Sequence, residues 1–265
     1  MPRRRASGAI ATALFLSLLS ACGEGGDGAA VVTEALSPHK GYPITIVYSH
    51  GAGEKGKPHK CDEKADVPKV LTNMVEQENV KIRYLCSNVS EDRREATYID
   101  ARAKEIEHFL FKLRAEGIPA RNIFLMGYME GAWASLIAAR RFGQHINGVV
   151  AFAPAFHGAR ERWKKLGDRK ARKARAPRAQ ANQITELSKA PLRAFVYAFK
   201  EDTFNGPEQL AFFRYVPGLR YIVSKQCKEG HKSLFTDCFA DYEKNRLRNH
   251  MKKMLAGPQV AKTVN

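Results

Sequence analysis

Short apolar segments rich in β-branched residues alternate with longer helical segments along most of this chain. Six of the short segments have the length of a strand, at residues 44–48, 80–86, 122–126, 147–153, 192–199 and 220–224. Helical stretches lie between and after them, at residues 67–77, 99–113, 131–142 and 239–254. A helical crossover between two strands makes that pair parallel. The alternation therefore predicts an α/β fold with a mostly parallel sheet of about six strands flanked by helices.

The size and charge of the chain limit its class. It has 265 residues, of which 44% are hydrophobic, so it can form a substantial core. Its formal net charge of +17 favours an anionic partner or surface, although charge does not determine the fold. The one long apolar run, residues 10–21, is shorter than the roughly 20 residues that cross a bilayer. A polytopic membrane protein is therefore excluded.

The N-terminus has the pattern of a targeting segment. Three arginines at positions 3–5 precede the apolar residues 10–19, and Leu19-Ser20-Ala21-Cys22 follows. This junction resembles the lipobox of bacterial lipoproteins, in which the cysteine receives a lipid. The resemblance implies a signal peptide at residues 1–21, a lipidated Cys22 and a Gly-rich tether at residues 22–41. The protein would then be exported to the bacterial cell envelope and anchored to a membrane, facing the periplasm or the outside. The alternative is an ordinary secretory signal with Cys22 left free.

Four further cysteines, an even number, fit an exported protein that forms disulfides. They are Cys61, Cys86, Cys227 and Cys238, which allow three connectivities. We favour Cys61 with Cys86 and Cys227 with Cys238, because both bonds would close loops of moderate length. Four reduced thiols or a zinc site are the alternatives, but the usual Cys-x-x-Cys spacing of zinc ligands is missing. We therefore expect no metal and no other cofactor.

The segment Gly127-Tyr128-Met129-Glu130-Gly131 lies directly between a predicted strand and a predicted helix. It resembles Gly-x-Ser-x-Gly, the nucleophile elbow of the α/β-hydrolase family. Residues 48–53, Tyr-Ser-His-Gly-Ala-Gly, resemble the His-Gly oxyanion loop of that family. Asp202 and His231 each follow a later strand, in the chain order nucleophile, acid, histidine. The resemblance covers residues 42–255, and it leaves residues 256–265 as a tail.

This resemblance implies a site with a serious defect. His231 and Asp202 would be the catalytic histidine and acid, with Glu201 as the alternative acid. The backbone of Gly51, Ala52 and Glu130 would form the oxyanion hole. The nucleophile position is occupied by Met129, and a thioether has no proton to lose and forms no acyl-enzyme.

Residues 157–190 occupy the place where this family carries a lid. Residues 160–178 hold ten basic residues and two acids, a local charge of +8. This segment is either a solvated helical lid or an anion-binding surface. The candidate anion-binding residues are Lys164, Lys165, Arg169, Lys170, Arg172, Lys173 and Arg175. An envelope polymer or an acidic small molecule fits an exported protein better than nucleic acid does.

Two classes of function follow. The first is a catalytically impaired, ligand-binding or regulatory lipoprotein on an α/β-hydrolase fold. The second is an active ester or amide hydrolase that uses His231 and Asp202 with water, or a nucleophile that the motifs do not reveal. A purely electrostatic role in envelope attachment is a third hypothesis.

Overall fold

The computed structural model of the chain describes residues 41–51, 60–89, 97–156 and 169–257. The predicted signal peptide, Cys22, the tether as far as residue 40 and residues 258–265 lie outside these ranges. Within them, no helix combines the length and apolar character needed to cross a membrane.

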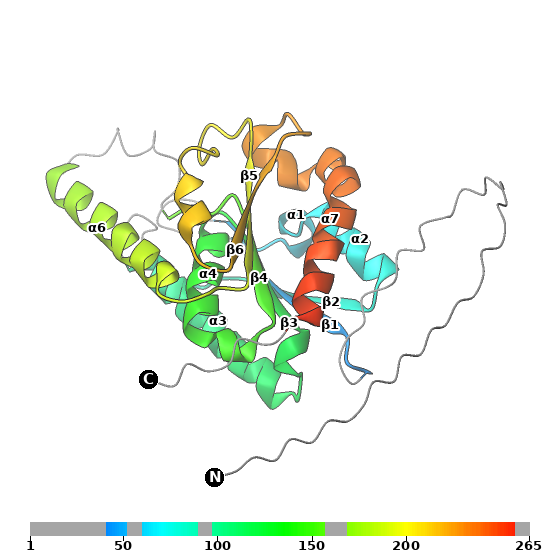
Figure 1. Cartoon of the computed structure of the whole chain (residues 1–265). Helices are drawn as coiled ribbons and strands as arrows, with labels where there is room; N and C mark the ends of the chain where they lie inside the picture. The colour runs from blue at the N-terminus through cyan, green and yellow to red at the C-terminus, as the bar shows by residue number, and fades with distance from the viewer. Residues whose placement is uncertain (1–40, 52–59, 90–96, 157–168, 258–265) are drawn as a thin grey trace, which may run out of the picture. The chain divides into compact units, whose positions relative to one another are not determined.

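The centre of the fold is a six-stranded sheet in which all neighbouring strands are parallel, as the sequence predicts (Figure 1). The strands are β1 (Ile44–Ser49), β2 (Val80–Leu85), β3 (Ile123–Tyr128), β4 (Gly148–Phe152), β5 (Ala194–Phe199) and β6 (Leu219–Ser224). Their order across the sheet is β2-β1-β3-β4-β5-β6. Ser49, at the end of β1, is in register with Gly127, near the end of β3. The carboxyl ends of β1 and β3 therefore lie together at the same edge of the sheet.

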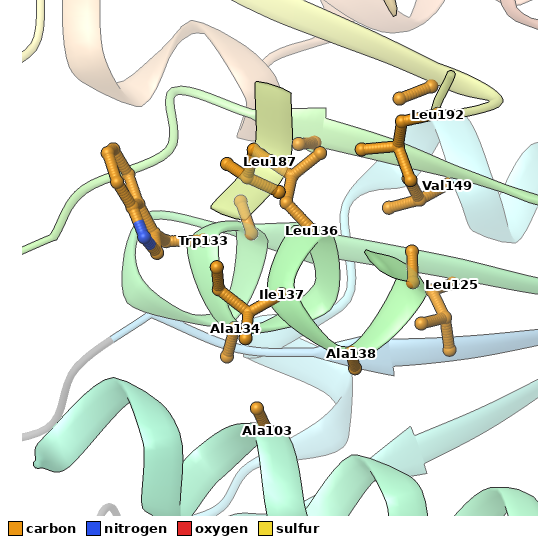
Figure 2. Close-up of a cluster of buried hydrophobic side chains, with 14 of the residues drawn as sticks. Ala103, Leu125, Trp133, Ala134, Leu136, Ile137, Ala138, Val149, Leu187 and Leu192 are labelled. Atoms are coloured by element: carbon orange, nitrogen blue, oxygen red, sulfur yellow. The ribbon is translucent and has the colours of Figure 1, made fainter. Parts of the chain in front are cut away.

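One face of the sheet is covered by α3 (Tyr98–Ala115), α4 (Glu130–Phe142) and α6 (Arg169–Ser188). Side chains of α4 pack between Ala103 of α3 and the strand residues Leu125 and Val149 (Figure 2). Leu187 of α6 joins the same cluster, and the indole N–H of Trp133 donates to Gln183 of α6 at 2.8 Å. The C-terminal part of α6 is thus docked on the domain.

The other face is covered by α2 (Lys69–Gln77) and α7 (Asp237–Ala256). Alternate strand residues such as Ile46, Phe124 and Tyr197 point to this side, where Leu71 and Leu247 meet them. Apolar burial on both faces explains why the inner strands β1, β3, β4 and β5 are nearly continuous apolar runs, whereas the edge strands β2 and β6 are partly exposed and include charged residues. A sheet covered on both sides by helices is the predicted α/β architecture.

The remaining elements are short. A single turn, α1 (Glu63–Asp66), precedes α2, and Pro68 separates the two because proline has no backbone N–H. The sequence predicted one helix from residue 67, so its start is corrected here. The four 3₁₀ turns of the described ranges are η2 (Ala120–Asn122), η3 (Gly143–His145), η4 (Ala211–Tyr215) and η5 (Gly230–Phe235).

Candidate functional site

Met129 forms a sharp turn between β3 and α4. Its backbone has φ 51° and ψ −121°, in a region that residues with a side chain rarely adopt. Three hydrogen bonds hold the turn: Met129 N donates to Phe152 O at 3.1 Å, and Met129 O accepts from the N–H groups of Trp133 at 3.1 Å and Ala155 at 2.9 Å. The neighbouring strand and the helix therefore fix the conformation of the tip, whatever its side chain.

Two glycines make this turn possible. A Cβ at Gly127 would lie 2.6 Å from the backbone of Gly131. A Cβ at Gly131 would lie 2.3 Å from the carbonyl oxygens of both Ser49 and His50. Real Cβ atoms do not come this close to backbone, so the strand and helix meet only because both positions lack a side chain. This arrangement is the elbow geometry that the motif predicts.

His231 and Asp202 form a hydrogen-bonded pair. His231 Nδ1 lies 2.7 Å from Asp202 Oδ2, and the Asp202 side chain has no exposed surface. The other carboxylate oxygen accepts from the backbone N–H groups of Phe204 at 2.7 Å and Asn205 at 3.0 Å. Glu201, the alternative acid, is half-exposed and pairs with Lys200. Asp202 is therefore the acid that faces the histidine.

The environment of Asp202 keeps it ionised. Burial raises its pKa, but the hydrogen bond and charge of His231 and the two backbone N–H groups lower the pKa more, so that it lies below the ordinary value. The ionised carboxylate accepts a hydrogen bond from His231 Nδ1, so whenever the ring is neutral Nε2 is its acceptor nitrogen. That Nε2 is buried and has no hydrogen-bond partner among the described residues. It is therefore available to a proton donor or to a ligand.

The expected oxyanion loop lies beside the elbow. A Cβ on Gly51 would lie 3.2 Å from Met129 Sδ, so the thioether packs against this glycine. Glu130, the first residue of α4, is fully buried. Ala52 lies outside the described residues. The structure thus brings Gly51 and residues 129–130 together.

Three residues that the sequence analysis did not single out also line this region. The hydroxyl of Tyr128 donates to His231 O at 2.7 Å, and the edge of Phe204 packs on the imidazole with ring centroids 5.1 Å apart. Burial, followed by the charges of Asp202 and Glu130, raises the pKa of Tyr128 and keeps its hydroxyl protonated. Arg102 contacts the oxyanion loop from α3. The sequence feature that could have drawn attention to Arg102 is a basic residue within the apolar stripe of a helix.

Both favoured cysteine pairs are at disulfide distance. The Cα atoms are 5.8 Å apart for Cys61 and Cys86 and 5.9 Å apart for Cys227 and Cys238. Ring or carboxylate atoms of His50 and Glu229 lie within 4.8 Å of these respective sulfurs. Zinc binds thiolates, and sulfurs joined in a disulfide offer none. These two groups are therefore not zinc sites while the bonds are intact.

The basic insertion is described only in part. Lys164 and Lys165 lie outside the described residues, and so does the segment 157–168. The other five candidate anion-binding residues belong to α6, but their side chains also lie outside the described part.

Solved structures similar to this one are hydrolases. *Paleococcus ferrophilus* monoacylglycerol lipase is 15% identical, with a TM-score of 0.57 over 81% of this chain and 96% of the lipase. Est1E from *Butyrivibrio proteoclasticus* is 12% identical, with a TM-score of 0.58 over 81% of this chain and 89% of Est1E. An α/β-hydrolase from the metagenome of Moroccan lagoon sediments is 17% identical, with a TM-score of 0.51 over 80% of this chain and 91% of that enzyme. The chain therefore has the α/β-hydrolase fold.

Sequence comparison adds no closer relationship. Neither a protein-family model nor a curated protein sequence matches this chain. At these identities the structural similarity defines the fold alone, so function has to be argued from the site.

Proposed function

We propose that this protein is an exported lipoprotein that binds a ligand at an α/β-hydrolase site without cleaving it. The observation that carries the proposal is Met129 at the strained tip of the elbow, with its thioether against Gly51. Acyl transfer needs an ionisable nucleophile at this point, and a thioether is not one. The rest of the site, including the His231–Asp202 pair, is retained and offers polar groups to a ligand.

The size of the expected loss supports binding over turnover. Removing the serine of a serine hydrolase lowers kcat by about 10⁶, while the oxyanion hole and substrate binding leave roughly 10³–10⁴ over the reaction in water. Two other serines near the elbow do not replace it. The side chains of Ser49 and Ser135 are both buried in the fold.

Water-based hydrolysis is a second candidate, and the unpartnered Nε2 of His231 favours it. With Asp202 holding Nδ1, this nitrogen could act as a general base on a water molecule. The apolar Met129 side chain counts against it, because a thioether does not hydrogen-bond a water well enough to hold it for attack.

The cellular context of the proposal comes from two segments of the sequence, of which residues 1–22 and 160–168 lie outside the described residues. The lipobox-like sequence ending at Cys22 supports lipid anchoring, and several acyl chains give stable attachment where one chain is marginal. The charge of +8 over residues 160–178 supports an anionic partner, such as an envelope polymer or an acidic small molecule.

The test compares the wild-type protein with Met129→Ser. The wild type should not react with a serine-directed phosphonate and should not hydrolyse a panel of short esters. Met129→Ser should gain labelling at residue 129 and measurable hydrolysis, because the new hydroxyl would share the site with His231. Recovery will be partial if the pocket is packed around the larger Met, since an error of about 1 Å can cost roughly 100-fold.

The control is Met129→Ser combined with His231→Ala, in which the labelling should disappear. Strong labelling of the wild type at any residue would refute the proposal. Ester hydrolysis by the wild type that is lost in His231→Ala would support the water-based alternative instead.

A further inference from the structure

Arg102 occupies an unusual place for a charged side chain. It lies on the inward stripe of α3, between the buried residues Ile99 and Ile106, and it is only 2% exposed. Among the described residues no carboxylate forms an ion pair with it, and the ring centre of Tyr98 lies 6.0 Å from the guanidinium carbon. Burying a guanidinium is costly unless its N–H groups find acceptors. The hydrogen-bond acceptors of Arg102 therefore show which contacts offset the free-energy cost of burying its guanidinium.

Both of these acceptors are backbone carbonyls of the oxyanion loop. Arg102 Nη2 donates to His50 O at 2.9 Å, and Nη1 donates to Gly51 O at 3.3 Å. The His50 ring supports the same arrangement, because Nδ1 bonds Gly51 O and Nε2 accepts from Ser87 N at 3.0 Å. In an extended strand successive carbonyls point to opposite sides. Here two successive carbonyls converge on one guanidinium.

This convergence determines the direction of a backbone N–H. In a planar trans peptide the N–H points opposite to the carbonyl of the same peptide. Arg102 holds His50 O on the α3 side, so the N–H of Gly51 points away from α3. Met129 and Tyr128 are the side chains that lie against Gly51. The guanidinium also places a positive charge directly behind the loop.

We propose that Arg102 is a positioning residue for oxygen binding at this site. By holding the His50 and Gly51 carbonyls it orients the loop N–H toward an oxygen atom of the ligand, which belongs to a carbonyl or carboxylate group. The inference rests on the proposed function only in treating the elbow as the ligand site. It also explains why an arginine interrupts the apolar stripe of α3.

The test places a thiol at the elbow tip and compares two reactions of that thiol. In Met129→Cys, p-nitrophenyl acetate acylates the thiolate: a C–S bond forms, p-nitrophenolate leaves, and the transition state carries an oxyanion. Iodoacetamide alkylates the same thiolate and releases iodide, with no oxyanion. Both products are quantified at residue 129 by peptide mass spectrometry, with the wild-type chain as the blank.

Arg102→Gln in the Met129→Cys background should slow acylation at least tenfold and change alkylation less than about twofold, because loss of one oxyanion-hole donor typically costs 10²–10³-fold. Arg102→Lys keeps the charge but not the two-pronged geometry, so acylation should slow by a smaller factor. This variant provides the measurement if Arg102→Gln does not fold. Arg141→Lys is the matched control, since Arg141 is half-buried and pairs with Asp100 and Glu186 away from the loop.

Equal slowing of both reactions would show that Arg102 only supports the fold, and unchanged acylation would show that it does not orient the loop. A thiol at residue 129 that neither reagent modifies would also overturn the proposal, because the loop would then face no accessible tip. Ester hydrolysis by the wild type would refute the proposed function without changing the ratio of the two reactions.

Discussion

At residue 129 the backbone conformation and the identity of the side chain have separate explanations. The positive φ follows from the hydrogen bonds of Met129 to Phe152, Trp133 and Ala155 and from the space that two glycines leave. Such a conformation costs on the order of 1–3 kcal/mol and persists only where the surroundings impose it. The side chain has no part in that geometry. The elbow geometry therefore does not depend on which side chain occupies its tip.

Gly131 gives a direct test of this close approach. Gly131→Ala should lower the free energy of unfolding by about 1–3 kcal/mol or more, because its Cβ would overlap the carbonyl oxygens of Ser49 and His50. Urea unfolding monitored by circular dichroism measures the change. Gly143→Ala is the control, since a Cβ there meets nothing within 4 Å and φ is −56°, and stability should stay within about 1 kcal/mol. Equal effects at both positions would contradict the tight packing of the elbow.

At the scale of elements, the four inner strands β1, β3, β4 and β5 were predictable because each is buried along its whole length and is therefore a short apolar run. The edge strands β2 and β6 are partly exposed and include charged residues, but their β-branched and aromatic residues still mark them in the sequence. Helix ends were less certain: the helix expected at residues 67–77 begins at Lys69, after Pro68, a separate turn α1 precedes it, and η5 carries His231. The order of the site motifs along the chain was enough to place the elbow and the pair of His231 and Asp202 at one edge of the sheet.

Contacts that depend on tertiary packing could not be predicted. Arg102 is distant in sequence from the carbonyls that it binds, and Phe204 reaches His231 across a loop. No spacing rule links such residues, since the fold alone brings them together. For the contact of Arg102, the only indication in the sequence is a charged residue within the apolar stripe of a helix.

The packing of α7 on β5 predicts a pH effect on stability. The His250 ring stacks on Phe195 with centroids 3.9 Å apart, and its Nδ1 lies 3.1 Å from the Tyr197 hydroxyl. Burial, together with the charges of Lys253, Arg246 and Arg220, lowers the pKa of His250 to about 4. The unfolded chain binds this proton near pH 6.5 and the folded chain does not, so stability should fall as the pH decreases from about 6.5 to 4.

The measurement is the free energy of unfolding of the wild type and of His250→Gln at several pH values. For each unit by which the pH falls in this window, the free energy of unfolding of the wild type should decrease by at most about 1.4 kcal/mol more than that of His250→Gln, which is the value for one proton. His108→Gln, at an exposed position on α3, is the control and should keep the wild-type slope. A slope that does not change in His250→Gln would contradict the prediction.

At the scale of the whole molecule, the proposed anchor lies outside the described residues, and so do residues 157–168 of the basic insertion. The domain itself has both sheet faces covered by helices, so it does not need a membrane to complete its core. Attachment would therefore depend on residues 1–41 and on the basic part of the insertion, residues 160–178.

Cys22→Ser should abolish lipidation and normal processing. Expressed as the full chain in bacteria, the variant should move from the detergent phase to the aqueous phase in a detergent partition experiment, because it would lose its acyl chains. Ser37→Ala, within the tether, should partition like the wild type. Unchanged partitioning of Cys22→Ser would exclude a lipid anchor at this residue.

Neutralising the insertion should weaken binding to anionic surfaces and leave the fold intact. Binding to phosphatidylglycerol vesicles should decrease when glutamine replaces the four lysines of the segment, Lys164, Lys165, Lys170 and Lys173. Added salt should weaken the wild type similarly, since exposed charges are screened over about 10 Å at 0.1 M. The matched control replaces four exposed lysines elsewhere, Lys189, Lys200, Lys225 and Lys228. Equal losses in both variants would indicate a general charge effect.

The strained tip also limits which single substitutions could lead from Met129 to a serine. The single Met codon, ATG, is at least two base changes away from any Ser codon. One of the short routes passes through Thr, whose branched Cβ is especially unfavourable at the positive φ of residue 129. Another passes through Arg, a long cation at a position packed against Gly51. Two further routes pass through Ile, which is also branched at Cβ, and through Leu, which is not. Of the four intermediates, Leu is therefore the one that the tip and the packing against Gly51 should tolerate best.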